Sequence, residues 1–288
     1  MSERIPVLKT YKMFVGGGFP RSESGRYFVF KSPEGESLAN VCLGSRKDVR
    51  DAVKTARGAF SGWKKRTAYN RGQILYRMGE MMEGRRDQFV AELQKQGQSA
   101  ESATAEVDAA VDRLIYYAGW ADKFQQVFSA VNPVASSHFN FSMPEPTGVV
   151  GLIAPDSPGL LGLVSQVAPA ICGGNTVVVL ASEAYPLTAI TFGEVLQASD
   201  LPGGVVNILT GSKAEMQPHL CQHMDVNAIW YPAQEDGDEL KAVQEAAALN
   251  VKRLSLKNYD DWSADAAANP YLIKDFLEIK TTWHPVGV

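Results

Sequence analysis

The sequence predicts an α/β protein built on a doubly wound parallel sheet, with an N-terminal layer of helices and a small additional β element. Three observations support this prediction. Apolar runs alternate with helical segments between residues 149 and 256, apolar residues recur at helical spacing over residues 45–126, and an alternating strand lies near the end. Apolar strands separated by helices indicate parallel pairing, because a parallel pair needs a long crossover connection.

The first expected elements are two short strands, Met13–Val15 and Tyr27–Phe30, separated by glycine-rich turns. The triple glycine Gly16–Gly18 is not a phosphate-binding loop, because further strand-forming residues follow it instead of a helix N-terminus. Helices are expected over residues 45–126, beginning at a capping box over Ser45–Asp48. We expect these helices to cover one face of a sheet.

Two segments carry a β pattern outside the parallel sheet. His138–Met143 alternates polar and aromatic residues like an exposed strand, and Pro144–Pro146 is expected to break it. The second segment, Phe276–Trp283, also alternates. Its two sides are formed by Phe276, Glu278, Lys280 and Thr282, and by Leu277, Ile279, Thr281 and Trp283. A lone strand with an apolar side must join an existing sheet edge, in this chain or in another.

The parallel sheet is expected to contain five apolar strands. These are Val149–Ile153, Thr176–Leu180, Val205–Leu209, Val226–Tyr231 and Arg253–Leu256. The helices expected between the later strands are Pro186–Gln197, Ala214–Met224 and Asp238–Leu249. Because parallel strands are covered on both faces, their near-continuous apolar character fits this placement.

Composition excludes several classes of protein. A net charge of −4 over 288 residues leaves no positive excess for nucleic acid or anionic membrane. Three dispersed cysteines, Cys42, Cys172 and Cys221, exclude a disulfide framework and a thiolate zinc site, and they fit a reducing compartment. The first residues are polar, and no apolar run is long enough to span a membrane. We therefore expect a cytoplasmic protein.

Several segments resemble the aldehyde dehydrogenase superfamily. They are GVVGLIAP (Gly148–Pro155), VAPAICGGNTVVV (Val167–Val179), SEAYPLTA (Ser182–Ala189), LPGGVVNILTG (Leu201–Gly211) and the tail FLEIKTTWHPVG. The resemblance implies that residues 1–130 and 148–258 form a Rossmann-like, NAD-binding-like domain. It also implies an oligomerisation element made of a hairpin (131–147) and a C-terminal strand (271–288). The catalytic domain of the family is absent between residues 258 and 271.

The resemblance implies that every catalytic position is vacant. No GQ-x-C segment supplies a nucleophile, and the three cysteines match no family position, so we interpret them as small hydrophobic residues. Ser157 stands where the family has its oxyanion-binding amide, beside the carboxylate of Asp156. Lys257 stands where the family has its general base, and a lysine cannot accept a proton at neutral pH.

The positions that bind the cofactor in the family are degenerate. Pro155, Ser182 and Glu183 match, and Glu183 could still bind a ribose, but Leu180 replaces the lysine. The turn that would meet the pyrophosphate is Pro232–Asp238, whose proline lacks a donor and whose carboxylates repel an anion. We expect no cofactor, with weak binding of NAD left open.

A metal site is not expected either. His219 and His223 lie four residues apart on a helix, a spacing that suits metal binding, but only Asp225 offers a third ligand nearby. We interpret both as solvated surface histidines.

The resemblance thus implies a non-catalytic subunit that assembles, as a homo- or hetero-oligomer, with a full-length aldehyde dehydrogenase paralogue. The residues expected to oligomerise are Phe139, Phe141, Phe276, Leu277, Ile279 and Trp283. One alternative is a homo-oligomeric module that keeps a nucleotide or small ligand in the old cofactor cleft beside Glu183. Another is an NAD-dependent oxidoreductase component that uses a catalytic domain from another chain, and a decayed gene product is a third.

Overall fold

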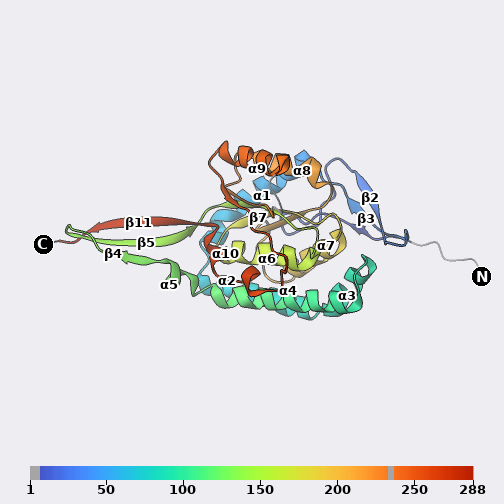
Figure 1. Ribbon diagram of the computed structural model, residues 1–288, viewed down its shortest axis with the longest axis horizontal. Coiled ribbons are helices and arrows are strands. Elements are labelled where there is room, and N and C mark those ends of the chain that lie inside the picture. The colour runs from blue at the N-terminus through green and yellow to red at the C-terminus, as the bar shows by residue number, and fades with distance from the viewer. Residues whose placement is uncertain (1–6, 233–236, 288) are drawn as a thin grey trace, which may run out of the picture.

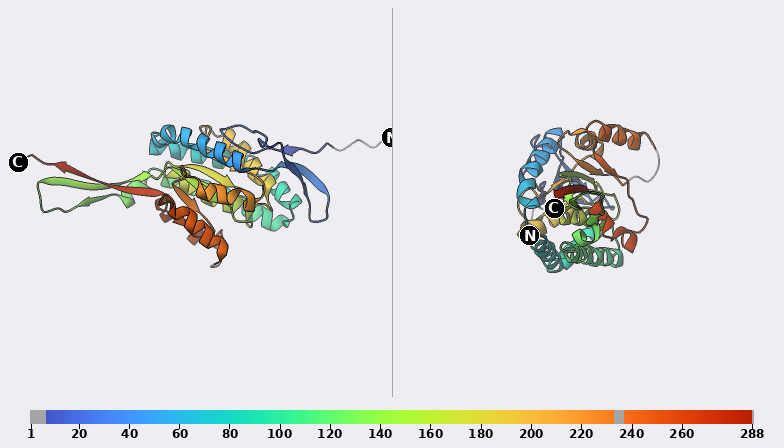
Figure 2. Two further views of the ribbon diagram at one scale, coloured as in Figure 1. Left: turned by 90° about the horizontal axis from the view of Figure 1, so that it is seen from above. Right: turned by 90° about the vertical axis from the view of Figure 1, so that its left-hand side faces the viewer.

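The molecule has two parts, an α/β body and a three-stranded β arm that projects from one end of it (Figures 1 and 2). The computed structural model describes residues 7–232 and 237–287 of the chain. Among these residues no helix is long and apolar enough to cross a membrane.

The body is built on a five-stranded parallel sheet, which confirms the predicted fold class. Its strands are β6 (Val149–Ile153), β7 (Thr176–Leu180), β8 (Val206–Leu209), β9 (Ala228–Trp230) and β10 (Arg253–Ser255). They lie in the order β10-β9-β6-β7-β8, so the chain starts at the centre and winds outward in both directions. Every residue of β6 and β7 is buried, as expected of central strands that are covered on both faces.

Helices cover both faces of this sheet (Figure 1). The connecting helices are α6 (Gly159–Cys172), α7 (Pro186–Gln197), α8 (Lys213–Gln222) and α9 (Asp238–Ala248). Alternate strand residues point to opposite faces. Val150 and Val177 pack with α6, α7 and the N-terminal helical layer, whereas Val149 and Val178 pack with α1 (Arg46–Lys64), α8 and α9.

The N-terminal region forms a small sheet followed by helices. Its strands are β1 (Thr10–Tyr11), β2 (Tyr27–Lys31) and β3 (Ser37–Cys42), and the helices after α1 are α2 (Ala68–Glu83), α3 (Arg86–Lys95), α4 (Ala100–Trp120) and α5 (Phe124–Phe128). The capping box at Ser45 is present. The strand predicted over Met13–Val15 is wrong, because only isolated bridges form there. Gly16 and Gly17, both with positive φ, turn the chain back at once.

The arm consists of β4 (Ala130–Asn132), β5 (His138–Pro146) and β11 (Leu277–Pro285), in the order β11-β5-β4. β11 pairs antiparallel with β5 of the same chain over its whole length. The prediction that Pro144–Pro146 breaks the strand is wrong, because β5 continues to Pro146. β4 pairs with β5 only as far as Ser142, so the prolines lie beside an open edge, where strands tolerate proline.

The segment between β10 and β11 packs tightly on the body. It contains a short 3₁₀ helix (Asp265–Ala267) and α10 (Tyr271–Lys274). Trp262 is buried and stacks on Trp230, which also contacts Phe276. Phe276 and Leu277 belong to the main core. Their assignment to the oligomerisation surface is therefore corrected: β11 becomes exposed only after these two residues.

Candidate functional site

A cleft of about 700 Å³ opens at the carboxyl ends of β6 and β9, where doubly wound sheets bind their ligands. Residues 153–157, which end β6 and follow it, form one wall, and the first residues of α8 and α9 form the others. This is the cleft in which the sequence places a degenerate cofactor site. Its side chains are already engaged with one another, as the following contacts show.

Lys213, the first residue of α8, reaches into the cleft. Its Nζ donates to the carbonyl oxygen of Ala154 at 2.7 Å and forms an ion pair with Asp156 Oδ1 at 2.6 Å. The lysine side chain is only 16% exposed, whereas that of Asp156 is 69% exposed. The sequence analysis did not single out Lys213. A lysine in the first turn of a helix opposes the helix dipole, which is the sequence signal that a carboxylate should lie nearby.

Glu183, the residue expected to contact a ribose, caps α8 instead. Its Oε1 accepts the backbone N–H of Lys213 at 2.5 Å, so the carboxylate lies at the positive end of the helix. Ser182 Oγ donates to the carbonyl oxygen of Asp156 at 3.0 Å and accepts the N–H of Ala184 at 3.1 Å. Pro155 lines the cleft, whereas Ser182 and Glu183 lie outside its lining.

Negative charge dominates the rest of the cleft. Asp238 and Glu239 occupy the first turn of α9, the position at which a helix N-terminus would otherwise hold a phosphate. Gln217 Nε2 donates to Glu239 Oε1 at 2.9 Å. With Asp156, three carboxylates line the cleft against the single ammonium of Lys213 among the described residues. The predicted turn Pro232–Asp238 lies partly outside the described residues, which omit 233–236.

Ser157 and Lys257, which the sequence matches to the family's oxyanion and base positions, line different pockets. Ser157 lines the cleft beside Asp156. Lys257 lies instead in a separate pocket next to β10, where its Nζ contacts Asp275 Oδ2 and its carbonyl oxygen accepts the indole N–H of Trp230 at 2.7 Å. An ion-paired lysine in another pocket has no means of removing a proton from a molecule in the cleft.

The thiols are buried away from the cleft. Cys42, Cys172 and Cys221 are at most 2% exposed. Burial raises the pKa of Cys172 and of Cys221 to about 12, so neither thiol ionises at neutral pH. In residues 7–232 and 237–287, no group of three or more His, Cys, Asp or Glu side chains is placed to hold a metal ion.

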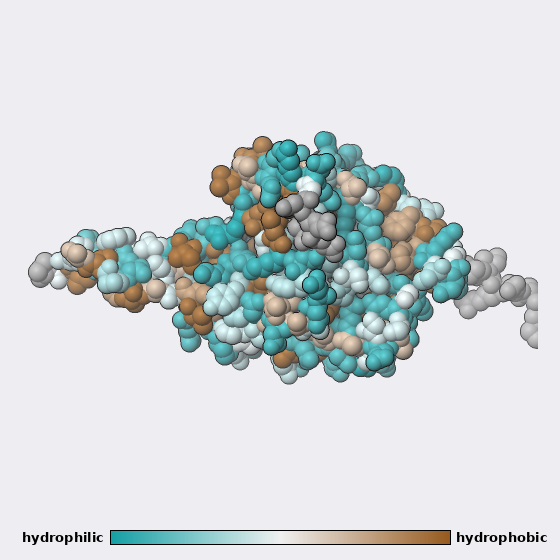
Figure 3. Space-filling view, viewed as in Figure 1, coloured by the Kyte–Doolittle hydropathy of each residue, from teal (hydrophilic) through white to brown (hydrophobic). Residues whose placement is uncertain are grey.

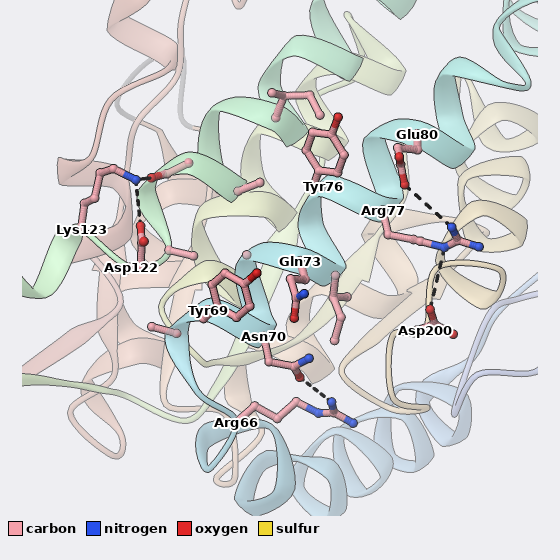
Figure 4. A pocket seen from close by; sticks show the side chains of 17 residues that line it. Arg66, Tyr69, Asn70, Gln73, Tyr76, Arg77, Glu80, Asp122, Lys123 and Asp200 are labelled. Atoms are coloured by element: carbon pink, nitrogen blue, oxygen red, sulfur yellow. Dashed lines mark hydrogen bonds and ion pairs between the residues drawn. The ribbon is translucent and has the colours of Figure 1, made fainter.

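Another cavity, of about 790 Å³, is a groove on the outer surface of α2 and α4 (Figure 4). Tyr69 and Tyr76 rise from α2 at its sides. Arg77 reaches toward Glu80 and Asp200 at 3.8 Å, and Lys123 pairs with Asp122 at 2.8 Å. Three cations and three carboxylates line the groove, so their charges balance. Arg77 and Lys123 pair with carboxylates, whereas Arg66 donates to Asn70 Oδ1 at 2.6 Å.

The β arm is the second candidate functional surface, because one of its faces is apolar. The antiparallel register puts Val131, Phe139, Phe141 and Met143 on this apolar face. A hollow of about 380 Å³ lies among them. Val131 is 68% exposed and Phe139 47% exposed. Hydrophobic side chains are visible along the projecting arm in the space-filling view (Figure 3). The sequence analysis found Phe139 and Phe141 but not Val131 or Met143.

The opposite face of the arm carries a polar ladder. Asn132 Nδ2 donates to Asn140 Oδ1 at 2.6 Å and to Ser142 Oγ at 2.9 Å, and Ser142 bonds to Thr281 at 2.8 Å. Exposed Ile279 and Trp283 share this face. β11 forms one edge of the arm, so its outer N–H and C=O groups face no other strand among the described residues.

Comparison with known proteins shows which family has this sequence and architecture. A family model described as "Aldehyde dehydrogenase family" matches residues 19–258. The chain is 35% identical over 255 residues to "Aldehyde dehydrogenase, cytosolic 1" of Elephantulus edwardii, covering 85% of this chain and 50% of that protein. It is 32% identical over 259 residues to "Retinal dehydrogenase 2" of Homo sapiens, covering 87% and 49%.

Solved structures agree with this result. An NAD⁺ complex of aldehyde dehydrogenase from Bacillus cereus aligns with a TM-score of 0.78 and 26% identity, covering 85% of this chain and 50% of that one. HpcC from Thermus thermophilus aligns with a TM-score of 0.80 and 30% identity, covering 85% and 47%. The chain therefore spans about half the length of the relatives that it matches. With the family model covering most of its length, the chain belongs to the aldehyde dehydrogenase family.

Proposed function

We propose that this chain is a non-catalytic member of the aldehyde dehydrogenase family, a structural or regulatory subunit that assembles with a catalytically competent aldehyde dehydrogenase. The arm would make the contact, and the assembly would be cytoplasmic. One observation carries the proposal: the side chains of the cofactor-like cleft are engaged with one another, while the arm keeps an apolar face and a strand edge uncovered.

The contacts in the cleft support the loss of chemistry. Lys213 and Asp156 form an ion pair in the space that a ligand would enter, and Glu183 is committed to the N-terminus of α8. A ligand in the cleft would have to displace the Lys213–Asp156 ion pair and face the carboxylates of Asp238 and Glu239.

The arm supports the assembly role. Exposed apolar side chains in one patch, here Val131, Phe139 and Met143, are typical of a protein contact, because isolated soluble surfaces rarely gather them. The free edge of β11 could add backbone hydrogen bonds to a strand of a partner. Several of the body's exposed charges are ion-paired with one another, which leaves the arm as the best candidate surface.

Titration with NAD tests the non-catalytic part of this proposal. We expect no binding of NAD tighter than a dissociation constant of about 1 mM, because the carboxylates of the cleft repel the pyrophosphate and Glu183 is unavailable. The measurement is isothermal titration of the purified chain, with a full-length aldehyde dehydrogenase titrated in parallel as the positive control.

Micromolar binding of NAD would contradict this expectation. It would support the alternative in which the chain supplies a cofactor to a catalytic domain of another chain. Micromolar binding of AMP or ATP without NAD would support a ligand-binding module instead. In either case the variant Glu183→Gln should weaken the binding, since it removes the charge that a ribose diol would contact.

A further inference from the structure

A small pocket, of about 280 Å³, lies between α1 and α8, away from the cofactor-like cleft. We call it the α1/α8 pocket. Its polar lining consists of Arg46, Lys47, Arg50, His219, Gln222 and His223. No carboxylate is among the residues that line it. The cleft is lined by the first residue of α8, whereas this pocket is lined by the last turns of the same helix, so the two sites are separate.

Two pairs of side chains with nitrogen groups line the pocket. Arg46 and Arg50 are four residues apart and share one side of α1. His219 lies in the last turn of α8, and His223 is the residue that follows the helix. The two helices pack side by side, so the pairs face each other across the pocket. Planar guanidinium groups bind phosphate oxygens two at a time, and imidazoles add single donors.

Carboxylates near the pocket engage its cations only at exposed positions. Lys47 pairs with Glu23 at 2.8 Å and Arg50 with Asp51 at 2.8 Å, and all four side chains are about half exposed. Arg46 forms no ion pair with the described residues. Exposed pairs of this kind contribute at most about 1 kcal/mol. An anion that contacts both arginines can therefore displace these carboxylates at a small energetic cost.

His223 can donate a hydrogen bond without being charged. His223 Nδ1 accepts the backbone N–H of Asp225 at 3.2 Å, so in the neutral ring the proton lies on Nε2. Burial lowers the pKa of His223, with Asp225 and Lys252 as its charged neighbours, so this ring is neutral at neutral pH. The chain thus offers an N–H donor from α8 beside the guanidinium groups of α1.

The helix itself adds positive potential. Arg46 and Arg50 lie in the first two turns of α1, a helix of 19 residues whose N-terminus carries partial positive charge. The nearby carboxylate Asp48 does not line the pocket. It is buried, and its oxygens accept from Ser22, Glu23 and Ser45.

We infer that the α1/α8 pocket binds the phosphate group of a small phosphomonoester. The volume of the pocket is below the roughly 300–1,000 Å³ of sites that enclose drug-sized ligands, so the phosphate enters and the rest of the molecule extends into solvent. This inference does not depend on the proposed function, since it uses no residue of the cleft or of the arm.

The four histidines of the chain provide the test. Imidazole resonances are followed by NMR during titration of the intact protein with inorganic phosphate, and then with glycerol phosphate, at one pH and one ionic strength held with sodium chloride. We expect saturable shifts for His219 and His223 with both ligands. His138 and His284, which lie on the arm, should not shift and serve as internal controls.

Replacing both arginines should weaken the binding. In Arg46→Ala with Arg50→Ala, the dissociation constant should rise about tenfold or more, since two charge-assisted contacts are lost. Both side chains are exposed, and alanine suits a helix, so the fold should persist, as unfolding curves can verify. The matched control is Arg66→Ala with Arg77→Ala. Arg66 lies just before α2 and Arg77 within it, and this variant should not change the dissociation constant. The inference is overturned if the shifts fail to saturate, if only inorganic phosphate binds, or if the double arginine variant binds like the wild type.

Discussion

Placing charge on the apolar face of the arm is expected to abolish assembly with a full-length aldehyde dehydrogenase. In the variant Phe139→Asp with Phe141→Asp, two aromatic side chains whose ring centroids lie 5.5 Å apart are replaced by carboxylates. Aromatic anchors commonly contribute about 2 kcal/mol or more each to an interface, so affinity should fall about a hundredfold or more. Analytical ultracentrifugation of the mixed proteins measures the change.

The control is a pair of exposed aromatic residues on another surface. Tyr69 and Tyr76 lie on α2 and are 69% and 51% exposed. Tyr69→Asp with Tyr76→Asp should leave assembly unchanged. A second test truncates the chain after Ile279, which removes most of β11 but keeps Phe276 and Leu277 in the core. If both arm variants assemble like the wild type, the arm is not the contact surface.

The second large effect is expected at Arg113, which fastens the segment between β10 and β11 to the body. Its guanidinium donates to Ser165 Oγ at 2.7 Å, to the carbonyl oxygen of Trp262 at 2.7 Å and to that of Ala267. The side chain is 4% exposed. Arg113→Ala leaves these buried acceptors without a donor and opens space in the core. We expect the free energy of unfolding to fall by roughly 3 kcal/mol.

Urea unfolding of the wild type and the variant measures this difference. Arg113→Lys, which keeps a charge but cannot donate in three directions, should lose an intermediate amount. Arg77→Ala, on the exposed side of α2, should change stability by less than about 0.5 kcal/mol. Hydrogen exchange should also quicken over residues 258–270 in Arg113→Ala. A loss below about 1 kcal/mol with unchanged exchange would contradict the role assigned to Arg113.

The body could be predicted from the sequence because its signals are local. Runs such as Thr176–Leu180 between helical segments define parallel strands, and the observed order of strands follows the rules for crossover connections. The prediction of a strand over Met13–Val15 was wrong, because residues with high β propensity form a strand only where a neighbouring strand is available to pair with them. The prediction that Pro144–Pro146 ends the strand was wrong, because a proline destabilises a strand only where its missing N–H would have bonded to a neighbouring strand.

The site was less predictable because its contacts join distant parts of the chain. Lys213 and Asp156 are 57 positions apart, and their ion pair depends on how α8 is oriented over the end of β6. Glu183 matched a family position in sequence, yet it faces a helix N-terminus. Phe276 and Leu277 share the alternation of β11, but the point at which a strand leaves the core is set by tertiary packing.

Native mass spectrometry of this protein isolated from its own cells tests the central claim most directly, with the co-purifying chains identified by their peptides. The account predicts a mixed assembly that contains a longer aldehyde dehydrogenase chain, and dehydrogenase activity only in fractions that contain that longer chain. A protein found only as a monomer or as a homo-oligomer, under conditions in which a known hetero-oligomer of the same cells survives, would contradict it.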